Sequence, residues 1–118
     1  MKRILLADDQ PQVRSALRLL LEQEIQAQIV GEAETLEDLL NQRPARNPEA
    51  ILLDWELPGL SPNADLPKVR QAYPLAQILA LSSRPEARQA ALQAGADAFV
   101  CKGDPPEQLL DALAHEGL

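Results

Sequence analysis

The stretch that decides the fold is Ile51-Leu52-Leu53-Asp54-Trp55-Glu56-Leu57-Pro58-Gly59. It begins as a short apolar run, which is typical of a buried strand, and turn-forming residues follow it directly. The apolar run stops at the carboxylate of Asp54. Ligands of open α/β sheets bind outside the carboxyl ends of the strands. The stretch therefore predicts a buried strand that carries Asp54 to a functional edge or, with equal weight, to the cap of the next loop.

Working outward from this strand, short apolar segments alternate with helical patterns along the whole chain. We expect strands at Lys2–Ala7, Gln28–Gly31, Ala50–Leu53, Gln77–Leu81 and Asp97–Cys101. Helices are expected at Pro11–Glu24, around Leu36–Leu40, at Asp65–Tyr73, from Ser83 to Gly95 and from Asp104 onward, with a polar connector at Arg43–Pro48. Such alternation predicts right-handed βαβ units and a parallel sheet that helices cover on both faces.

Local signals set the expected starts of three helices. Thr35 and Asp38 resemble a capping pair for the second helix. Ser83 and Glu86 have the spacing of a capping box for the fourth. Pro67 fits the first turn of the third helix, because no N–H is needed there.

The composition predicts one soluble domain over residues 1–118. Hydrophobic residues make up 46% and charged residues 25% of the chain, as in ordinary globular domains. The formal net charge of −7 argues against direct binding to nucleic acid or to an anionic membrane. Cys101 is the single cysteine, which excludes a disulfide within the chain and favours a cytoplasmic setting. We expect Cys101 to be a small core residue and His115 to be solvated in the last helix.

Polar side chains follow four of the five expected strands. Asp8 and Asp9 follow the first strand, Asp54 the third, Ser82 the fourth and Lys102 the fifth. These positions meet at one edge of a parallel sheet, where clustered carboxylates invite a hard divalent cation such as Mg²⁺. A lysine and a hydroxyl opposite the cation would hold the oxygens of a phosphoryl group. One carboxylate would then be free to act as a nucleophile and form an acyl phosphate.

Each of these residues also has an ordinary structural interpretation. Asp8 and Asp9 are suitable helix caps, and a lone Lys102 is most simply a solvated strand end. The capping box at Ser83 leaves Ser82 free, and Glu56 is most simply a loop carboxylate. The coincidence of suitable residue types on four separate segments favours the functional interpretation of the set.

Five pieces of the sequence carry a resemblance that covers essentially the whole chain. They are Ile4-Leu5-Leu6-Ala7-Asp8-Asp9, Ile51 to Gly59, Leu81-Ser82-Ser83, Gly95-Ala96-Asp97-Ala98-Phe99 and Cys101-Lys102. In this order and at these spacings they resemble the receiver domain of a two-component response regulator. The resemblance implies a flavodoxin-like (βα)5 three-layer sandwich with a five-stranded parallel sheet in the order 2-1-3-4-5. The run from Gly95 to Phe99 and the non-proline residue after Lys102 resemble the subfamily whose receiver precedes a LuxR-type DNA-binding domain.

The resemblance also implies roles for the site residues. Asp54 would be the phosphoacceptor. Asp8, Asp9, Asp54 and the backbone carbonyl of Glu56 would hold Mg²⁺ or Mn²⁺. Lys102 would pair with the charged phosphoryl group.

A second set of implications concerns switching and partners. Ser82 would take a phosphoryl oxygen, and Phe99 would move inward as Ser82 moves toward the phosphate. A histidine kinase or phosphotransfer protein would supply the phosphoryl group. The face built from the fourth helix, the fifth strand and the fifth helix would then change, and would mediate homodimerisation or contact with a C-terminal DNA-binding output domain.

Three positions depart from the usual receiver pattern. Ser61-Pro62 stands where an Asp-Gly pair usually leads into the third helix. Gly103 follows the lysine in place of a proline, which leaves the geometry of that peptide bond open. Glu56 and Arg84 occupy the two variable positions beside the phosphoryl site. We expect this pair to approach each other, to cover part of Asp54 and to slow the attack of water on the acyl phosphate.

Two other functions use the same residue types. A pseudo-receiver would keep the fold as a protein-binding module that no longer switches, and the altered loop at Ser61-Pro62 favours it slightly. A metal-dependent phosphatase of the haloacid dehalogenase type also uses an Asp nucleophile, a second acid, a Ser or Thr and a Lys. Its nucleophile follows the first strand, however, whereas Asp54 follows the third.

Overall fold

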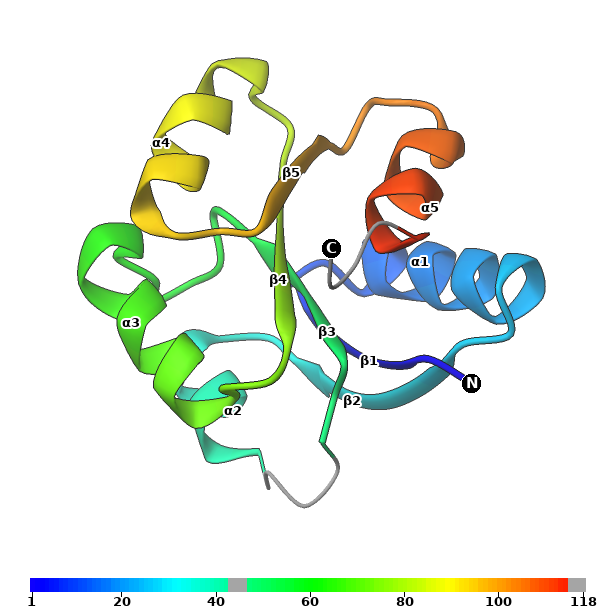
Figure 1. Cartoon of the computed structure of the whole chain (residues 1–118), viewed down its shortest axis with the longest axis horizontal. Coiled ribbons are helices and arrows are strands. Elements are labelled where there is room, and N and C mark those ends of the chain that lie inside the picture. The colour runs from blue at the N-terminus through cyan, green and yellow to red at the C-terminus, as the bar shows by residue number, and fades with distance from the viewer. Residues whose placement is uncertain (43–46, 115–118) are drawn as a thin grey trace.

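Short apolar strands form the centre of the molecule, and helices pack against them from both sides (Figure 1). The structure is a computed structural model, and it describes residues 1–42 and 47–114. The elements in chain order are β1 (Arg3–Ala7), α1 (Pro11–Glu24), β2 (Gln28–Ala33), α2 (Leu36–Asn41), β3 (Ala50–Asp54), α3 (Pro62–Ala72), β4 (Gln77–Ser82), the 3-10 turn η2 (Pro85–Ala87), α4 (Arg88–Ala94), β5 (Ala98–Cys101) and α5 (Pro106–Ala114).

The five strands form one parallel sheet in the order β2-β1-β3-β4-β5, as predicted. The register places Ala7 beside Leu53 and Asp54 beside Leu81. The carboxyl ends of β1, β3 and β4 therefore lie together at one edge. The order changes direction at β1, where β2 lies on one side and β3 on the other, and such a switch point is where open α/β sheets bind ligands.

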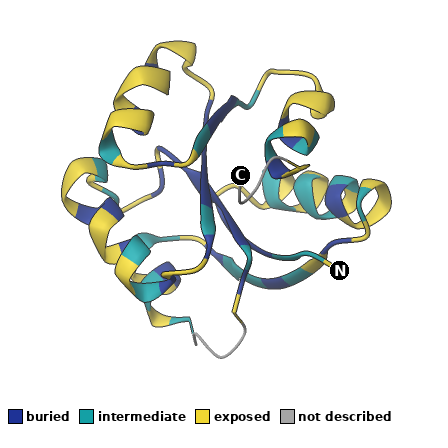
Figure 2. Cartoon of the chain, in the orientation of Figure 1, coloured by how far each residue is buried: buried dark blue, intermediate teal, exposed yellow. Residues whose placement is uncertain are grey.

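Successive residues of a strand point to opposite faces of the sheet, and the apolar side chains build two cores in this way. Ile51 and Leu53 of β3 belong to the core beneath α2, α3 and α4. Ala50 and Leu52 belong to the core beneath α1 and α5. Figure 2 shows the central strands mostly buried, the edge strand β2 only partly buried, and the outward faces of the helices exposed. β3 is buried at every position, which confirms the interpretation of the stretch that opens the sequence analysis.

Two helix ends form as their sequences predict. Thr35 Oγ1 accepts a hydrogen bond from the Asp38 N–H at 3.0 Å, and so caps the start of α2. Gly95 ends α4 with a φ of 115°, a left-handed conformation that favours glycine.

The predicted start of the third helix is wrong. α3 begins at Pro62, three residues before the expected Asp65, so Pro67 lies inside the helix and not in its first turn. The extra turn forms because Pro62 needs no N–H partner at a helix start. The carboxylate of Asp65 stabilises it further by accepting the Ser61 N–H at 2.7 Å. Ser61-Pro62 thus provides a helix start in place of the Asp-Gly pair that the resemblance to receiver domains led us to expect.

The predicted capping box at Ser83 and Glu86 is also wrong. The chain enters the 3-10 turn η2 after Arg84, and α4 follows with Ala87 at its cap position. Pro85 fixes the backbone at the start of η2, which delays the helix. The strands differ less from prediction, since β2 continues to Ala33 and β3 and β4 each include one residue more than expected.

The carboxyl end of α5 is attached to the edge of the sheet opposite Asp54. Lys2 Nζ donates to the Leu113 carbonyl oxygen at 2.7 Å. Gln77 Nε2 donates to the Ala112 carbonyl oxygen at 3.3 Å. Lys2 directly precedes β1 and Gln77 is the first residue of β4, so the last turn of α5 is held at the amino ends of these two strands.

Two details of the sequence analysis concern chain geometry and coverage. The described residues contain no cis peptide bond, so the bond between Lys102 and Gly103 is trans. His115 and most of the connector expected at 43–48 lie outside the described residues.

Replacing Leu53 with alanine tests the packing of the central strand. Leu53 is fully buried on β3, so Leu53→Ala should lower the free energy of unfolding by about 2–5 kcal/mol. Urea unfolding followed by circular dichroism measures the change. Leu19→Ala on α1 is the matched control, because the Leu19 side chain is exposed and its truncation should cost much less. Equal losses in the two variants would contradict the packing described here.

Candidate functional site

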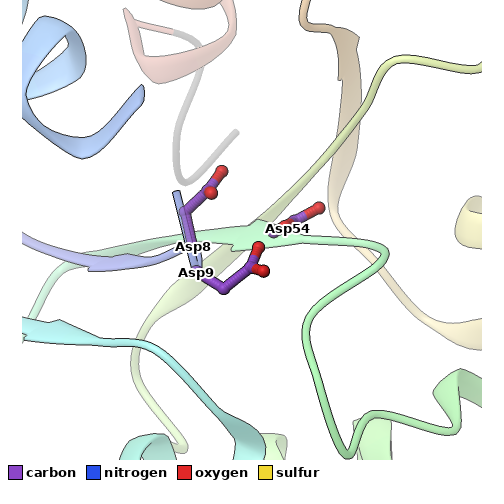
Figure 3. Close-up of side chains that lie close together, drawn as sticks. All are labelled: Asp8, Asp9 and Asp54. Carbon is purple, nitrogen blue, oxygen red and sulfur yellow. The ribbon is translucent and has the colours of Figure 1, made fainter. Parts of the chain in front are cut away.

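Three carboxylates meet where β1 and β3 end (Figure 3). Asp54 is the last residue of β3, and Asp8 and Asp9 directly follow β1. Each of the three contributes a carboxylate oxygen to a group in which all the oxygens lie within 4.8 Å of one another. Asp8 and Asp54 are buried, with 1% and 2% of their surface exposed, whereas Asp9 is exposed. The fold therefore brings together the three acidic residues that the sequence predicted to meet.

A tight turn directly after Asp54 brings the backbone N–H of Glu56 to the Asp54 side chain. The Glu56 N–H donates to Asp54 Oδ1 at 3.0 Å, and the Leu57 N–H donates to the Asp54 carbonyl oxygen. Burial raises the pKa of Asp54, and the nearby charge of Asp8 raises it further. The hydrogen bond from Glu56 and the charge of Lys102 oppose this shift without cancelling it.

Lys102 provides the positive charge of the cluster. Its Nζ lies 2.8 Å from Asp8 Oδ2 and 3.3 Å from Asp54 Oδ1. The Lys102 backbone N–H donates to the Ser82 carbonyl oxygen, which fixes the lysine at the end of the sheet. Burial lowers the pKa of Lys102, but the contacts with Asp8 and Asp54 outweigh that effect and raise it overall. Lys102 is therefore a partly buried, charged partner of the two aspartates and not a solvated strand end.

The Ser82 hydroxyl has two hydrogen-bond partners at the same edge of the sheet, which we call the rim. Ser82 Oγ donates to Glu56 Oε2 at 2.9 Å and accepts the Arg84 N–H at 3.0 Å. The expectation that a capping box leaves Ser82 free is therefore wrong, because the hydroxyl itself closes the turn into η2. Glu56 Oε2 also lies 3.0 Å from Arg84 Nη2, so the expected contact between Glu56 and Arg84 is present.

Phe99 is buried on β5, with 5% of its surface exposed. The guanidinium group of Arg88, at the start of α4, lies 5.0 Å from the centre of the Phe99 ring. A cation at this distance from an aromatic ring is attracted to the negative face of the ring. Arg88 thus ties α4 to the aromatic side chain expected to switch, and sequence spacing alone gave no signal for this contact.

Arg14 of α1 also contacts the acidic cluster, and the sequence analysis did not single it out. Its Nη1 donates to the Asp8 carbonyl oxygen at 2.6 Å, and its Nε donates to Glu32 Oε1 at 2.8 Å. A basic residue in the first turn of the helix that follows Asp8 and Asp9 was a visible signal. Its partner, Glu32 on β2, was not, because strand pairing had to be known before the two side chains could be matched.

The residues of this cluster fit a hard divalent cation. Carboxylate oxygens are the ligands that Mg²⁺ takes from proteins, and it keeps waters and phosphate oxygens as its other ligands. Asp8 Oδ2 is buried and, among the described residues, receives no hydrogen bond of normal geometry despite its closeness to Lys102. This oxygen can therefore be shared with a cation, together with oxygens of Asp9 and Asp54.

The family model of the response regulator receiver domain matches residues 4–114. The chain belongs to this family. The match covers every described strand and helix from Ile4 onward, and it supports the sheet order and the resemblance drawn from the sequence. Receiver domains of response regulators are signalling domains, which separates this chain from the haloacid dehalogenase phosphatases.

Relatives of this receiver domain are response regulators. It is 34% identical over 112 residues to the nitrate/nitrite response regulator NarL of Escherichia coli K12, covering 93% of the chain and 52% of NarL. The chain thus spans about half the length of the curated relatives it matches. The receiver domain of NarL from Mycobacterium tuberculosis superposes with a TM-score of 0.82 at 27% identity, covering 96% of this chain and 93% of that one.

A third relative was solved as a complex. RcsB of Salmonella enterica serovar Typhimurium, bound to promoter rprA in the presence of the phosphomimetic BeF3⁻, has a TM-score of 0.83 at 27% identity. The comparison covers 98% of this receiver domain and 68% of RcsB.

Among residues 1–42 and 47–114, no helix combines the length and the apolar character needed to cross a membrane.

The raised pKa of Asp54 predicts how the free energy of unfolding depends on pH. The folded receiver domain holds the Asp54 proton more tightly than the unfolded chain does, so the ionised carboxylate costs stability above its raised pKa. Asp54→Asn should therefore raise the free energy of unfolding at pH 7. The gain should shrink as the pH falls through the raised pKa toward the usual aspartate range, and one pKa unit corresponds to about 1.4 kcal/mol.

Urea unfolding of both proteins at a series of pH values measures this gain. Asp9→Asn is the matched control, because Asp9 belongs to the same cluster but is exposed, and its replacement should change stability little. A gain in Asp54→Asn that stays the same from pH 7 to pH 4 would contradict the prediction.

Proposed function

We propose that this chain is a phosphorylation-dependent switch in which Asp54 accepts a phosphoryl group. The observation that carries the proposal is the position of Asp54, buried at the end of β3 beside Asp8, with the ammonium group of Lys102 in contact with both carboxylates. A buried nucleophile beside a cation site and a lysine suits phosphoryl transfer, which depends on positioning and on charge stabilisation. The donor would be a histidine kinase or a phosphotransfer protein.

In the proposed reaction, an oxygen of Asp54 attacks the phosphorus of a phosphohistidine. A P–O bond forms and the P–N bond breaks. The electron pair of the P–N bond stays on the imidazole nitrogen, which takes up a proton from water. Asp8, Asp9, Asp54 and the backbone carbonyl of Glu56 would hold Mg²⁺ or Mn²⁺, which neutralises charge on the phosphoryl oxygens when bound.

The hydrogen bonds of Ser82 suggest how phosphorylation would be sensed. In the structure the Ser82 hydroxyl donates to Glu56 Oε2. To donate to a phosphoryl oxygen, Ser82 must leave Glu56, so the carboxylate of Glu56 competes with the phosphoryl group for the same proton. We propose that this exchange moves Ser82 inward, and that Phe99 and the contact of its ring with Arg88 transmit the change to α4.

The partners of the switched state are part of the same proposal. The face of α4, β5 and α5 would change its preference for a second copy of the chain or for a C-terminal DNA-binding output domain. The support is that Arg88 and Phe99 lie on this face, and that the relative RcsB was solved on promoter DNA with a phosphomimetic. We further propose that residues 1–118 act as one receiver unit in the cytoplasm, and that they make no direct contact with nucleic acid.

The experiment that tests the function is intact mass measurement after incubation with Mg²⁺ and acetyl phosphate. The parent should gain a single addition of about 80 Da that is labile in base, whereas Asp54→Ala should gain none. No addition to the parent under any metal condition would favour the pseudo-receiver. An addition that persists in Asp54→Ala would place the acceptor elsewhere.

We also propose that Glu56 and Arg84 shield the acyl phosphate. Their ion pair lies on the rim beside Asp54, and Glu56 Oε2 joins it to Ser82. Removing the side chain in Arg84→Ala should open this rim to water and shorten the dephosphorylation half-life. The expected factor is about two to five, because exposed ion pairs contribute about 0–1 kcal/mol.

Loss of base-labile phosphate over time, in excess Mg²⁺, measures this half-life. Arg18→Ala is the control, since Arg18 is a partly exposed arginine whose ion pairs with Glu22 and Glu32 lie on α1 and β2, away from the rim. Equal half-lives in the parent and in Arg84→Ala would remove the shielding role.

A further inference from the structure

Arg14 is a largely buried arginine that joins three elements beside the acidic cluster. Only 13% of its side chain is exposed. It lies in the first turns of α1, and its guanidinium group reaches back to the Asp8 carbonyl oxygen. The same group pairs with Glu32 near the end of β2, and it lies 3.7 Å from Glu34 in the loop beyond.

The turn that carries Asp8 and Asp9 is held by hydrogen bonds on all sides. The Asp8 N–H donates to the Ala33 carbonyl oxygen of β2 at 2.9 Å. Asp8 Oδ1 accepts the Gln10 N–H at 2.9 Å. Arg14 takes the remaining backbone group, the Asp8 carbonyl oxygen, at 2.6 Å. Arg14 therefore holds the backbone of this turn from α1, whereas Lys102 contacts only the Asp8 carboxylate.

We propose that Arg14 is a positioning residue for the divalent cation. By holding the Asp8 carbonyl oxygen, it fixes the peptide plane between Asp8 and Asp9, and so the directions in which both carboxylates leave the backbone. Arg14 touches neither the cation nor Asp54 itself. The inference rests on the metal site described under the proposed function, and it assigns a contribution to a residue outside the ligand set.

The anchoring of Arg14 supports this role. A guanidinium group presents several N–H donors in one rigid plane, so it can bind a carbonyl and a carboxylate at the same time. Glu32 Oε1 fixes the far side of that plane by accepting the Arg14 Nε–H. Loss of the hydrogen bonds that orient metal ligands, made by residues that do not touch the metal, typically weakens metal binding by about 10–100-fold.

A purely structural role is the competing explanation, and Arg18 separates the two. Arg18 pairs with the same Glu32 carboxylate from the next turn of α1. Among the described residues, its ion pairs are with Glu32 and Glu22, and not with Asp8. If the ion pairs of Glu32 matter only for packing α1 on β2, then Arg14→Ala and Arg18→Ala should behave alike. If the Asp8 carbonyl contact matters, only Arg14→Ala should affect the cation.

The test is titration of the parent, Arg14→Ala, Arg14→Lys and Arg18→Ala with Mg²⁺ alone. Trp55, the single tryptophan, is next to Asp54 and buried, so its fluorescence reports binding, and titration calorimetry provides an independent measure. Arg14→Ala should bind Mg²⁺ about tenfold more weakly than the parent. Arg14→Lys keeps the charge but lacks the planar pair of donors, and should lie between the two. Arg18→Ala should match the parent.

Each outcome decides the matter. Unchanged Mg²⁺ affinity in Arg14→Ala overturns the proposal, even if its unfolding midpoint falls. Equal weakening in Arg14→Ala and Arg18→Ala also overturns it, because the effect then comes through Glu32. If Arg14→Ala does not fold, unchanged affinity in Arg14→Lys overturns the proposal and weaker affinity supports it. A parent that binds no Mg²⁺ would reject the metal site itself, and the positioning role with it.

Discussion

Two carboxylates are buried close together where β1 and β3 end, and the ammonium group of Lys102 contacts both. Like charges removed from water are costly, and the cost is tolerable only where an opposite charge and hydrogen bonds compensate them. Here one ammonium group faces Asp8 and Asp54, and Asp9 adds a third carboxylate at the surface. The acidic excess is what makes the site receptive to a cation, and the rest of the fold keeps that excess in place.

The sheet tolerates these charges at its edge because apolar packing on its two faces stabilises it. β3 is buried at every position, and its two faces belong to two separate apolar cores. The polar groups occupy only the strand ends. Two sets of side chains then enclose them: Glu56, Ser82 and Arg84 on the side of α4, and Arg14 with Glu32 on the side of α1. The repulsion between the clustered carboxylates is thus confined to one edge of the sheet.

The sequence was sufficient for the fold class and for the placement of Asp8, Asp9, Asp54, Ser82 and Lys102 at one edge of the sheet, and its resemblance to receiver domains supplied the strand order. Period and turn residues define short parallel strands, and the topology then brings their carboxyl ends to one edge. The sequence alone did not predict the helix starts where several local signals compete. Pro62 and Pro85 decided the starts of α3 and η2 against the capping patterns beside them. The two bonds of Ser82 and the contacts of Arg14 depend on which segments lie side by side, and a single sequence does not encode that locally.

The attachment of α5 has a mechanical consequence. Its last turn is held by Lys2 and Gln77, whereas its first turn follows the short segment after Lys102. The two ends of α5 are therefore constrained differently. Hydrogen bonds from the far edge of the sheet hold its carboxyl end, and the chain joins its amino end directly to the acidic edge. Any change in the position of Lys102 would thus act first on the amino end of the helix.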